Sequence, residues 1–587
     1  MGLLRRTFSF ARPYKKTVSL AAFLTVAVAF LGPLRPYLIQ KAIDDYVVIE
    51  KYTGLIRLGD YAGLLFMTIL IVILICFEAV FQFYQTYYAN WIGQTVIKDL
   101  RLQTYEKIMS FKTQYFDRNP IGKLVTRVVS DIETIAEVFS QGLIIIFGDI
   151  LKLIVVLAFM FATDWRLSLY SLIPIPVLIM ATNVFKRAIK SAFQEVRNQV
   201  SNLNSFVQEH VTGMSVVQLF NREHIEYEKF EELNKKHRDA HIRTVWAYSI
   251  FFPVVEILSA LSLAALVWWG ASGVVQGQVT QGNLVAFILY IYMLFRPIRE
   301  LADRFNTLQL GMVSADRVFR VLDTESSIRD EGTLKKERLD GSITFKNLWF
   351  AYNEEEFILK GINLEIEPGQ TLALVGATGS GKSSIINVLG RYYEFQKGQI
   401  LIDGEDIRSY AVPELRSRMA LVQQDVLLFS DSILNNITLN SPEIGFDEVV
   451  EASKAVGAHE FIMELPGNYQ YNVRERGVML SLGQRQLISF IRAYVSRPDI
   501  LILDEATSSI DTVTEELIKR STEILTRDRT SIIVAHRLST IQKAQKIAVL
   551  HHGEVVEMGN HSQLLARDGY YRKYFLSQFA HETKEVS

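Results

Sequence analysis

Long apolar stretches occupy most of the first half of the chain. They run at 18–34, 61–92, 139–163, 167–185, 249–274 and 282–296. A bilayer core about 30 Å thick is crossed by roughly 20 helical residues. Buried core helices of a soluble protein would not recur so often at this length. The pattern therefore predicts six membrane-spanning helices.

The basic residues between these stretches predict an orientation. Segments 93–138 and 186–248 hold seven and ten Lys or Arg, whereas 41–60, 164–166 and 275–281 hold four in total. Because basic loops stay in the cytosol, both termini are expected there. The two basic segments carry mixed charge at helical spacing, so they are expected to continue the membrane helices into the cytosol.

The pattern of hydrophobic and polar residues changes near residue 326. Residues 1–325 are expected to form the six-span domain, with an interfacial helix in the basic, aromatic N-terminal segment. A polar run at 323–341 reads as a linker, and short β-like runs then alternate with helical patterns. Residues 326–587 are therefore expected to form an α/β domain with a mainly parallel sheet.

Composition narrows the class of protein. The 587 residues include 62 Lys+Arg and 63 Asp+Glu, a net charge of -1 that gives no support to nucleic-acid binding. Hydrophobic residues make up 49% of the chain, which excludes disorder for most of it. Cys76 is the one cysteine, so the sequence holds neither an intrachain disulfide nor a cysteine cluster for zinc.

A glycine-rich segment between an apolar strand pattern and a helical pattern fits G-x-x-x-x-G-K-S. Its glycines let successive backbone N–H groups face phosphates, and the following helix adds its positive N-terminus. Lys382 is placed to reach the β- and γ-phosphates of ATP, and Ser383 to hold Mg²⁺. The predicted nucleotide-binding residues of this loop are Gly376, Ala377, Thr378, Gly379, Ser380, Gly381, Lys382, Ser383 and Ser384.

Two further apolar strand patterns end in polar side chains. The first, "ILIL", leads into Asp504 and Glu505. Asp504 is expected to hold Mg²⁺ through water, and Glu505 to act as the general base on an attacking water. The second leads into His536, which is expected to contact the γ-phosphate. Together with the phosphate loop these residues predict ATP hydrolysis.

Ionisable residues inside the spans need a partner or water, because a charge in hydrocarbon is costly. Asp149 and Lys152 are spaced to pair on one helix. Glu78 and Glu256 have no opposite charge nearby in sequence. These two are candidates to touch a cationic substrate in a water-filled cavity. Pairing with another helix, or a place near the membrane interface, is the alternative.

With these motifs in place, nearly the whole chain resembles the ATP-binding cassette exporters, as a half-transporter of the multidrug and lipid-export type. "LSLGQ" is similar to the family signature LSGGQ, and Gln424 to the Q-loop that senses Mg²⁺. Tyr352 is similar to the aromatic residue that stacks on adenine. Segments 116–131 and 209–223 look like the two cytosolic coupling regions. The signature residues are Leu480, Ser481, Leu482, Gly483 and Gln484, and those of the D-loop are Ser508 and Asp511.

The resemblance implies a mechanism. Two nucleotide domains face each other head to tail and hold ATP between the phosphate loop of one and the signature of the other. Closure turns the membrane halves outward, and hydrolysis resets them. The chain carries one copy of each motif, so it is expected to need a second half-transporter.

Leu482 departs from the glycine that is usual in the family. Its side chain would lie near the partner's ATP, and it would be strained if the position required positive φ. The phosphate loop, Asp504, Glu505 and His536 keep the family pattern. The combination of an altered signature with intact nucleotide-binding residues favours a heterodimer. In that pair this chain supplies the catalytic glutamate to the ATP site that is competent for hydrolysis. A homodimer that tolerates leucine is the alternative.

The expected function is export of amphipathic drugs or lipids, driven by hydrolysis of ATP with Mg²⁺. Aromatic, Met and acidic residues in the spans fit an adaptable apolar cavity that would contact membrane lipid and a hydrophobic or amphipathic substrate. Export of peptides or metabolites is one alternative. An ATP-gated channel or regulatory subunit is disfavoured by Glu505 and His536. The expected location is the bacterial inner membrane.

Overall fold

The computed structural model describes residues 3–47, 61–138, 144–326, 328, 330–353, 356–504, 512–535 and 537–579. The chain divides into two compact units. The first comprises Met1–Met109 and Ile121–Thr324 and is helical. The second comprises Ser110–Pro120 and Glu325–Ser587 and is built around β-sheets. The predicted order of a helical membrane region and an α/β ATPase region is confirmed.

The helices of the first unit follow the apolar pattern. Five helical stretches of the described residues are long and apolar enough to cross a membrane, and the sixth predicted span lies within α12. Residues 139–143, at the start of the third predicted span, lie outside the described residues. The main helices are α2 (Lys15–Tyr46), α3 (Tyr61–Met109), α7 (Ile144–Thr163), α8 (Trp165–Leu172), α9 (Ile175–Thr212), α11 (Glu223–Val275) and α12 (Gln281–Asp323). Shorter segments are α1 (Leu3–Ser9), α5 (Ile121–Thr126), η2 (Arg127–Asp131), α6 (Ile132–Glu137) and α10 (Met214–Leu219).

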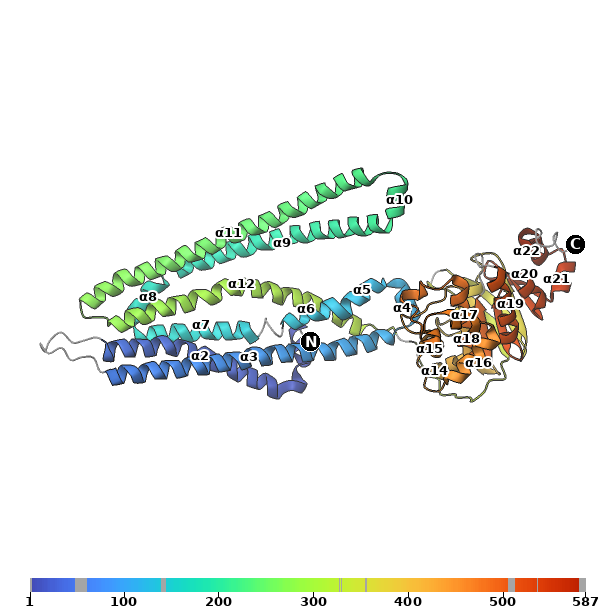
Figure 1. Ribbon diagram of the computed structural model, residues 1–587, viewed down its shortest axis with the longest axis horizontal. Coiled ribbons are helices and arrows are strands. Elements are labelled where there is room, and N and C mark those ends of the chain that lie inside the picture. The colour runs from blue at the N-terminus through green and yellow to red at the C-terminus, as the bar shows by residue number, and fades with distance from the viewer. Residues whose placement is uncertain are drawn as a thin grey trace. The chain divides into compact units, whose positions relative to one another are not determined.

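Two groups of helices make up this unit (Figure 1). α9 and α11 pack along each other as one long hairpin that α10 closes. α2 packs against α3, α7 and α12. Tyr290 Oη donates a hydrogen bond of 3.0 Å to the main-chain oxygen of Pro33, which joins α12 to α2. α3, α9 and α11 are much longer than the roughly 20 residues that a bilayer needs, as the mixed charge of 93–138 and 186–248 predicts.

The core of the second unit is a six-stranded sheet in the order β10-β9-β3-β8-β7-β6. The β9–β3, β3–β8, β8–β7 and β7–β6 pairs are parallel, and only β10 runs antiparallel. Apolar residues fill these strands because helices cover the sheet. The strands are β3 (Thr371–Val375), β6 (Met419–Val422), β7 (Ile500–Asp504), β8 (Thr530–Val534), β9 (Lys546–His551) and β10 (Glu554–Gly559).

A second sheet has the order β2-β1-β4-β5, with antiparallel pairs throughout. Its strands are β1 (Ile343–Phe350), β2 (Leu359–Ile366), β4 (Lys397–Ile402) and β5 (Glu405–Asp406). The longer helices of this unit are α13 (Lys382–Leu389), α16 (Phe446–Val456), α18 (Leu482–Val495), α19 (Thr512–Thr526) and α22 (Tyr570–Phe579). Its short helices are α4 (Thr113–Arg118), α14 (Val412–Ser417), α15 (Ile433–Thr438), α17 (His459–Glu464), α20 (Leu538–Lys543) and α21 (His561–Ala566).

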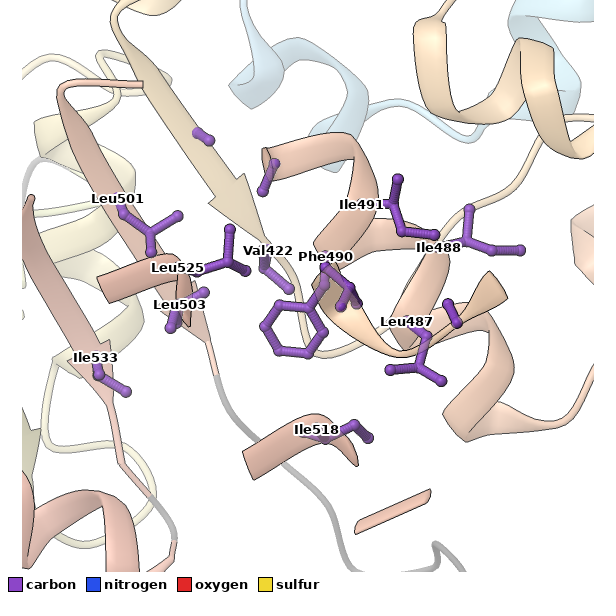
Figure 2. Close-up of a cluster of buried hydrophobic side chains, with 14 of the residues drawn as sticks. Val422, Leu487, Ile488, Phe490, Ile491, Leu501, Leu503, Ile518, Leu525 and Ile533 are labelled. Carbon is purple, nitrogen blue, oxygen red and sulfur yellow. The ribbon is translucent and has the colours of Figure 1, made fainter. Parts of the chain in front are cut away.

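One buried cluster holds α18 against the core sheet (Figure 2). Leu487 and Phe490 of α18 belong to the same cluster as Leu501 and Leu503 of β7. Burying a side chain of this size contributes about 1.5–3 kcal/mol. The cluster therefore fixes the start of α18, which carries the signature residues, relative to the strand that ends in Asp504.

Candidate nucleotide site

The order of the core sheet gathers the predicted nucleotide residues at one edge. β3, β8, β7 and β6 are parallel neighbours, so their carboxyl ends meet at that edge. The phosphate loop follows β3, Asp504 ends β7, and Gln424 comes two residues after β6. Asp504 lies opposite Val534 of β8, and Val422 lies opposite Leu503. Residues more than 100 positions apart thereby reach one place.

The glycines of the phosphate loop are required by its backbone. Gly376, Gly379 and Gly381 have φ of 156°, 81° and 107°, in the region that favours glycine. A Cβ on Gly376 would lie 2.3 Å from the main-chain oxygen of Leu550. The loop then leads directly into α13, so the backbone N–H groups at the start of that helix are available to an anion.

Lys382 is folded back onto its own loop. Its Nζ donates hydrogen bonds of 2.7 Å to the Gly376 oxygen and 3.1 Å to the Ala377 oxygen. Burial lowers the pKa of Lys382, and the nearby Asp504 carboxylate opposes this effect. The loop thus holds a desolvated ammonium where a phosphate would restore its charge balance.

Three oxygen-bearing side chains at or next to this edge are of the kinds that bind a hard cation. Ser383 and Gln424 are exposed, and Asp504 is half-buried. A hydroxyl, an amide oxygen and a carboxylate are ligands that Mg²⁺ accepts, usually together with water and substrate phosphates. The residues present therefore fit the Mg²⁺ that such a site uses.

Tyr352 stands at the wall of a cavity of about 650 Å³. Its ring packs edge-on against Phe350 and Tyr393, with centroid distances of 4.7 and 4.9 Å. Its hydroxyl bonds Ser384 Oγ at 3.1 Å and accepts from Asn387 Nδ2 at 3.0 Å. Both partners lie on α13, so Tyr352 is tied to the helix that follows the phosphate loop.

α4 also contacts this wall, which the sequence motifs did not predict. Gln114 Nε2 and Arg118 Nη2 both donate to the main-chain oxygen of Tyr352, at 3.0 and 3.1 Å. Tyr393 Oη donates to Asp117 Oδ2. The resemblance of 116–131 to a coupling region was the signal that this segment meets the ATPase region. It did not show which residues meet.

The signature residues begin α18. Ser481 is its N-cap: its Oγ accepts from the Gln484 N–H at 3.2 Å, and the Gln484 side chain accepts from the Ser481 N–H at 3.0 Å. Leu480 and Gly483 are buried. Leu482 is the first residue of the helix and is absent from the described residues with positive φ. The conditional expectation of backbone strain at Leu482 therefore does not apply.

Four predicted site residues lie outside the described residues: Glu505, Ser508, Asp511 and His536. Asp504 and Ala535, which directly precede two of them, do lie at the carboxyl edge of the sheet. Their catalytic and D-loop roles stay predictions.

The two substrate candidates of the membrane unit, Glu78 and Glu256, lie in different surroundings. Glu78 lines a cavity among α2, α3, α7 and α12, whereas Glu256 is exposed on α11 and does not line that cavity. Hydropathy alone could not distinguish these positions, since both residues interrupt an apolar span.

Comparison with known proteins agrees with both units. Residues 18–298 match the family described as the ABC transporter transmembrane region, and residues 359–508 match the ABC transporter family. An ATP-dependent lipid A-core flippase of Syntrophus aciditrophicus is 33% identical over 99% of this chain and 95% of its own. A Bacillus subtilis protein provisionally named for multidrug export is 33% identical over 98% of this chain and 100% of its own. The ABC transporter ATP-binding protein YknV of the same organism is 36% identical over 98% of this chain and 94% of its own.

Proposed function

The chain belongs to the ATP-binding cassette (ABC) transporter family, and we propose that it is one half of a two-chain exporter of amphipathic molecules. Family membership makes it an integral membrane protein whose ATPase is coupled to transport. The observation that carries the rest is the shared edge of the core sheet. That edge brings together Lys382 of the phosphate loop, Gln424 and Asp504.

At this edge different residues of the chain act on different parts of ATP. The phosphate loop and Lys382 bind the phosphates, and Tyr352 supplies an aromatic face for adenine. Mg²⁺, when bound, would be held by Ser383, Asp504 and Gln424 and would neutralise phosphate charge. Glu505 would take the proton of the attacking water, and His536 would contact the γ-phosphate.

A partner chain is needed because one chain has one phosphate loop and one signature. The surface next to the signature supports this requirement. Val478 and Met479 immediately precede it and are 72% and 54% exposed. Exposed apolar side chains beside a functional segment mark a place where another protein surface docks. Ser481 caps α18 directly after these two residues, and the positive N-terminus of this helix would interact with the partner's phosphates.

The tip of the α9–α11 hairpin adds a second apolar surface. Met214, Val216 and Leu219 of α10 and the adjacent Phe220 are exposed. This tip lies in 209–223, the segment that resembles the second coupling region. An exposed apolar tip on a cytosolic extension suits a contact with an ATPase region, and the partner chain would supply one.

We favour a heterodimer because of Leu482. The side chain is half-buried at the first position of α18, so it adds bulk at the site completed by the partner's ATP. The chain's own phosphate loop is intact in sequence, and Glu505 follows Asp504. In such a pair this chain would complete the active site with its partner's signature, and its own signature would face a weaker site.

The proposed location is the bacterial inner membrane, with the ATPase region in the cytosol. The excess of Lys and Arg in 93–138 and 186–248 supports this orientation, and the compared relatives are bacterial. The lipid A-core flippase among them adds support for a lipid-like substrate.

Transport is tested in inside-out membrane vesicles that contain the chain together with its partner. ATP should drive uptake of an amphipathic probe, and Glu505→Gln in this chain should abolish that uptake. Asp568→Asn, a carboxyl-to-amide change at a residue outside the nucleotide site, is the matched control. Uptake that needs no ATP, or that survives Glu505→Gln, would contradict the proposal.

A further inference from the structure

Asp131 is a buried carboxylate that lies outside the nucleotide site. It ends η2, the π-helical turn between α5 and α6. Ser314 Oγ of α12 donates a hydrogen bond of 3.0 Å to Asp131 Oδ1, and Arg317 Nη1 of the same helix lies 3.6 Å from that oxygen. Arg127 Nη1 donates to the other carboxylate oxygen, Oδ2. Asp131 therefore contacts α12 with one oxygen and the start of its own turn with the other.

This contact between η2 and α12 is costly to break. The side chain of Arg127 is mostly buried, and that of Arg317 is half-exposed. A buried carboxylate that loses its partners becomes an uncompensated charge away from water, which is strongly unfavourable. Ser314 is also buried, so its hydroxyl would lose a partner that water does not readily replace. We therefore expect η2 and this part of α12 to move together.

η2 is also a place where a helical segment can bend. π-helical turns are rare, they often lie at functional positions, and they are among the recognised causes of sharp helix bends. α3 contacts this turn as well, because Arg101 Nε donates a hydrogen bond of 3.3 Å to the main-chain oxygen of Val128. The turn is thus held by side chains of two long helices, α3 and α12.

The helices on the two sides of η2 differ in their packing. Ile132 of α6, directly after the turn, belongs to one buried cluster with Ala315 and Val318 of α12. α5, directly before the turn, exposes Ile121 and Val125. η2 therefore separates a segment that is packed against α12 from a segment with exposed apolar side chains.

The position of Asp131 in the chain gives this contact a role. Asp131 is the last residue of 116–131, the segment that resembles a coupling region. α12 contains the last predicted span, and Ser314 and Arg317 lie within its final ten residues. The predicted linker to the ATPase region begins at residue 323. One carboxylate thus connects the predicted coupling region to the helix that leads into the ATPase region.

We propose that Asp131 is a positioning residue for transport: it holds η2 to α12, so that a displacement of the predicted coupling region also moves α12. This inference rests on the proposed export function and deepens it by naming the residue that links the two segments. Asp131 acts through α12 and does not contact ATP. Removal of its charge should therefore lower the amount of substrate moved per ATP and leave ATP binding nearly unchanged.

The test uses the complete transporter, this chain with its partner, in inside-out membrane vesicles. The kcat and KM of ATP hydrolysis and the ATP-driven uptake of rhodamine 6G, an amphipathic dye, are measured on one preparation. Asp131→Asn keeps the size of the side chain and removes its charge. Uptake per ATP hydrolysed should fall about fivefold or more, the range in which coupling between two sites commonly lies. The KM for ATP should change less than about twofold.

Glu133→Gln is the matched control. It makes the same carboxyl-to-amide change two residues later, on an exposed side chain that pairs with Arg101 of α3. Because exposed ion pairs contribute little, uptake per ATP should stay within about twofold of the parental value.

Ser314→Ala is a second variant that leaves all the charges in place. It removes one neutral donor to Asp131, so it should lower uptake per ATP in the same direction by a smaller factor. Added to Asp131→Asn, it should have little further effect, because the two residues act through one contact. Ser314→Ala decides the test if Asp131→Asn does not assemble.

Uptake per ATP at the parental value in Asp131→Asn, or in Ser314→Ala where the first variant does not assemble, would overturn the inference. A raised KM for ATP, or kcat and uptake that fall in the same proportion, would show a structural role and overturn it as well. Parent transporter that hydrolyses ATP without taking up the dye would instead contradict the export proposal. Parent transporter that takes up the dye beside an Asp131→Asn variant with an unchanged ratio would overturn the inference alone.

Discussion

The side-chain amide of Gln114 donates a hydrogen bond of 3.0 Å to the main-chain oxygen of Tyr352, a residue 238 positions later in the chain. Arg118 donates to the same oxygen. Tyr352 is also bonded through its hydroxyl to α13, the helix that follows the phosphate loop. A change in Tyr352 on nucleotide binding would therefore reach α4 directly. We propose this contact as a route from a nucleotide bound at Tyr352 to the predicted coupling region 116–131, which includes Arg118.

Removing both donors should weaken that route. Each lost hydrogen bond is worth about 0.5–1.5 kcal/mol, so Gln114→Ala combined with Arg118→Ala should reduce substrate stimulation of ATPase by roughly fivefold or more. Unstimulated turnover should change less. Gln103→Ala, an exposed glutamine on α3, is the control. Undiminished stimulation in the double variant would show that the contact is not a coupling route.

Two variants should show that different residues are needed for ATP binding and for ATP hydrolysis. Lys382→Ala removes the ammonium that we propose binds the phosphates, and it should weaken ATP binding by about tenfold or more. Glu505→Gln keeps the binding groups and should slow hydrolysis by about two orders of magnitude or more. Nucleotide titration and single-turnover hydrolysis measure the two effects. Hydrolysis at the parental rate by Glu505→Gln would exclude this residue as the base.

The pH dependence of ATP binding should follow Lys382. Burial lowers the pKa of this side chain in the absence of nucleotide, and phosphate should raise that pKa again because it favours the charged form. Affinity should therefore be highest below the lowered pKa and fall as the pH rises through it. In that range ATP binding should take up protons.

Calorimetry in two buffers of different ionisation enthalpy measures this uptake. Lys382→Arg is the control, since its guanidinium stays charged throughout this pH range. Affinity that stays constant as the pH approaches about 10, with no proton uptake, would show that Lys382 does not change protonation on binding.

Changing Leu482 in the signature tests whether the two ATP sites of the transporter differ in activity. Leu482 begins α18 in a helical conformation, so Leu482→Gly relieves no strain and should cost up to about 1 kcal/mol of stability. It also removes the side chain that would lie near the partner's ATP. We expect it to raise the turnover of the site that this signature completes. An unchanged rate in a correctly assembled transporter would show that the leucine does not impair that site.

Much of the molecule could be predicted from local sequence. The phosphate loop follows a buried strand, and its glycines occupy the conformations that only glycine adopts readily. Contacts between distant segments could not be predicted in this way. The bonds from Gln114 and Arg118 to Tyr352 join residues on α4 to a residue two positions after β1, far along the chain. No local periodicity encodes that pairing.

The sequence also could not predict which residues of a membrane helix line a cavity. Glu78 and Glu256 look alike in a hydropathy profile, yet only the first of them lines the cavity among α2, α3, α7 and α12. The sequence predicts backbone strain at Leu482 only if this position requires a positive φ. The helical conformation of Leu482 at the start of α18 excludes that strain. In each case the missing information was the position of neighbouring elements.

The central proposal is that this chain works as one member of an unlike pair. It is tested most directly by the ATPase activity of the chain purified alone in lipid nanodiscs, with the mass of the particle measured on the same sample. We expect a monomer, or a two-copy particle with little turnover, whose activity rises when the partner half-transporter is added. Brisk hydrolysis by a particle of two identical chains would contradict it.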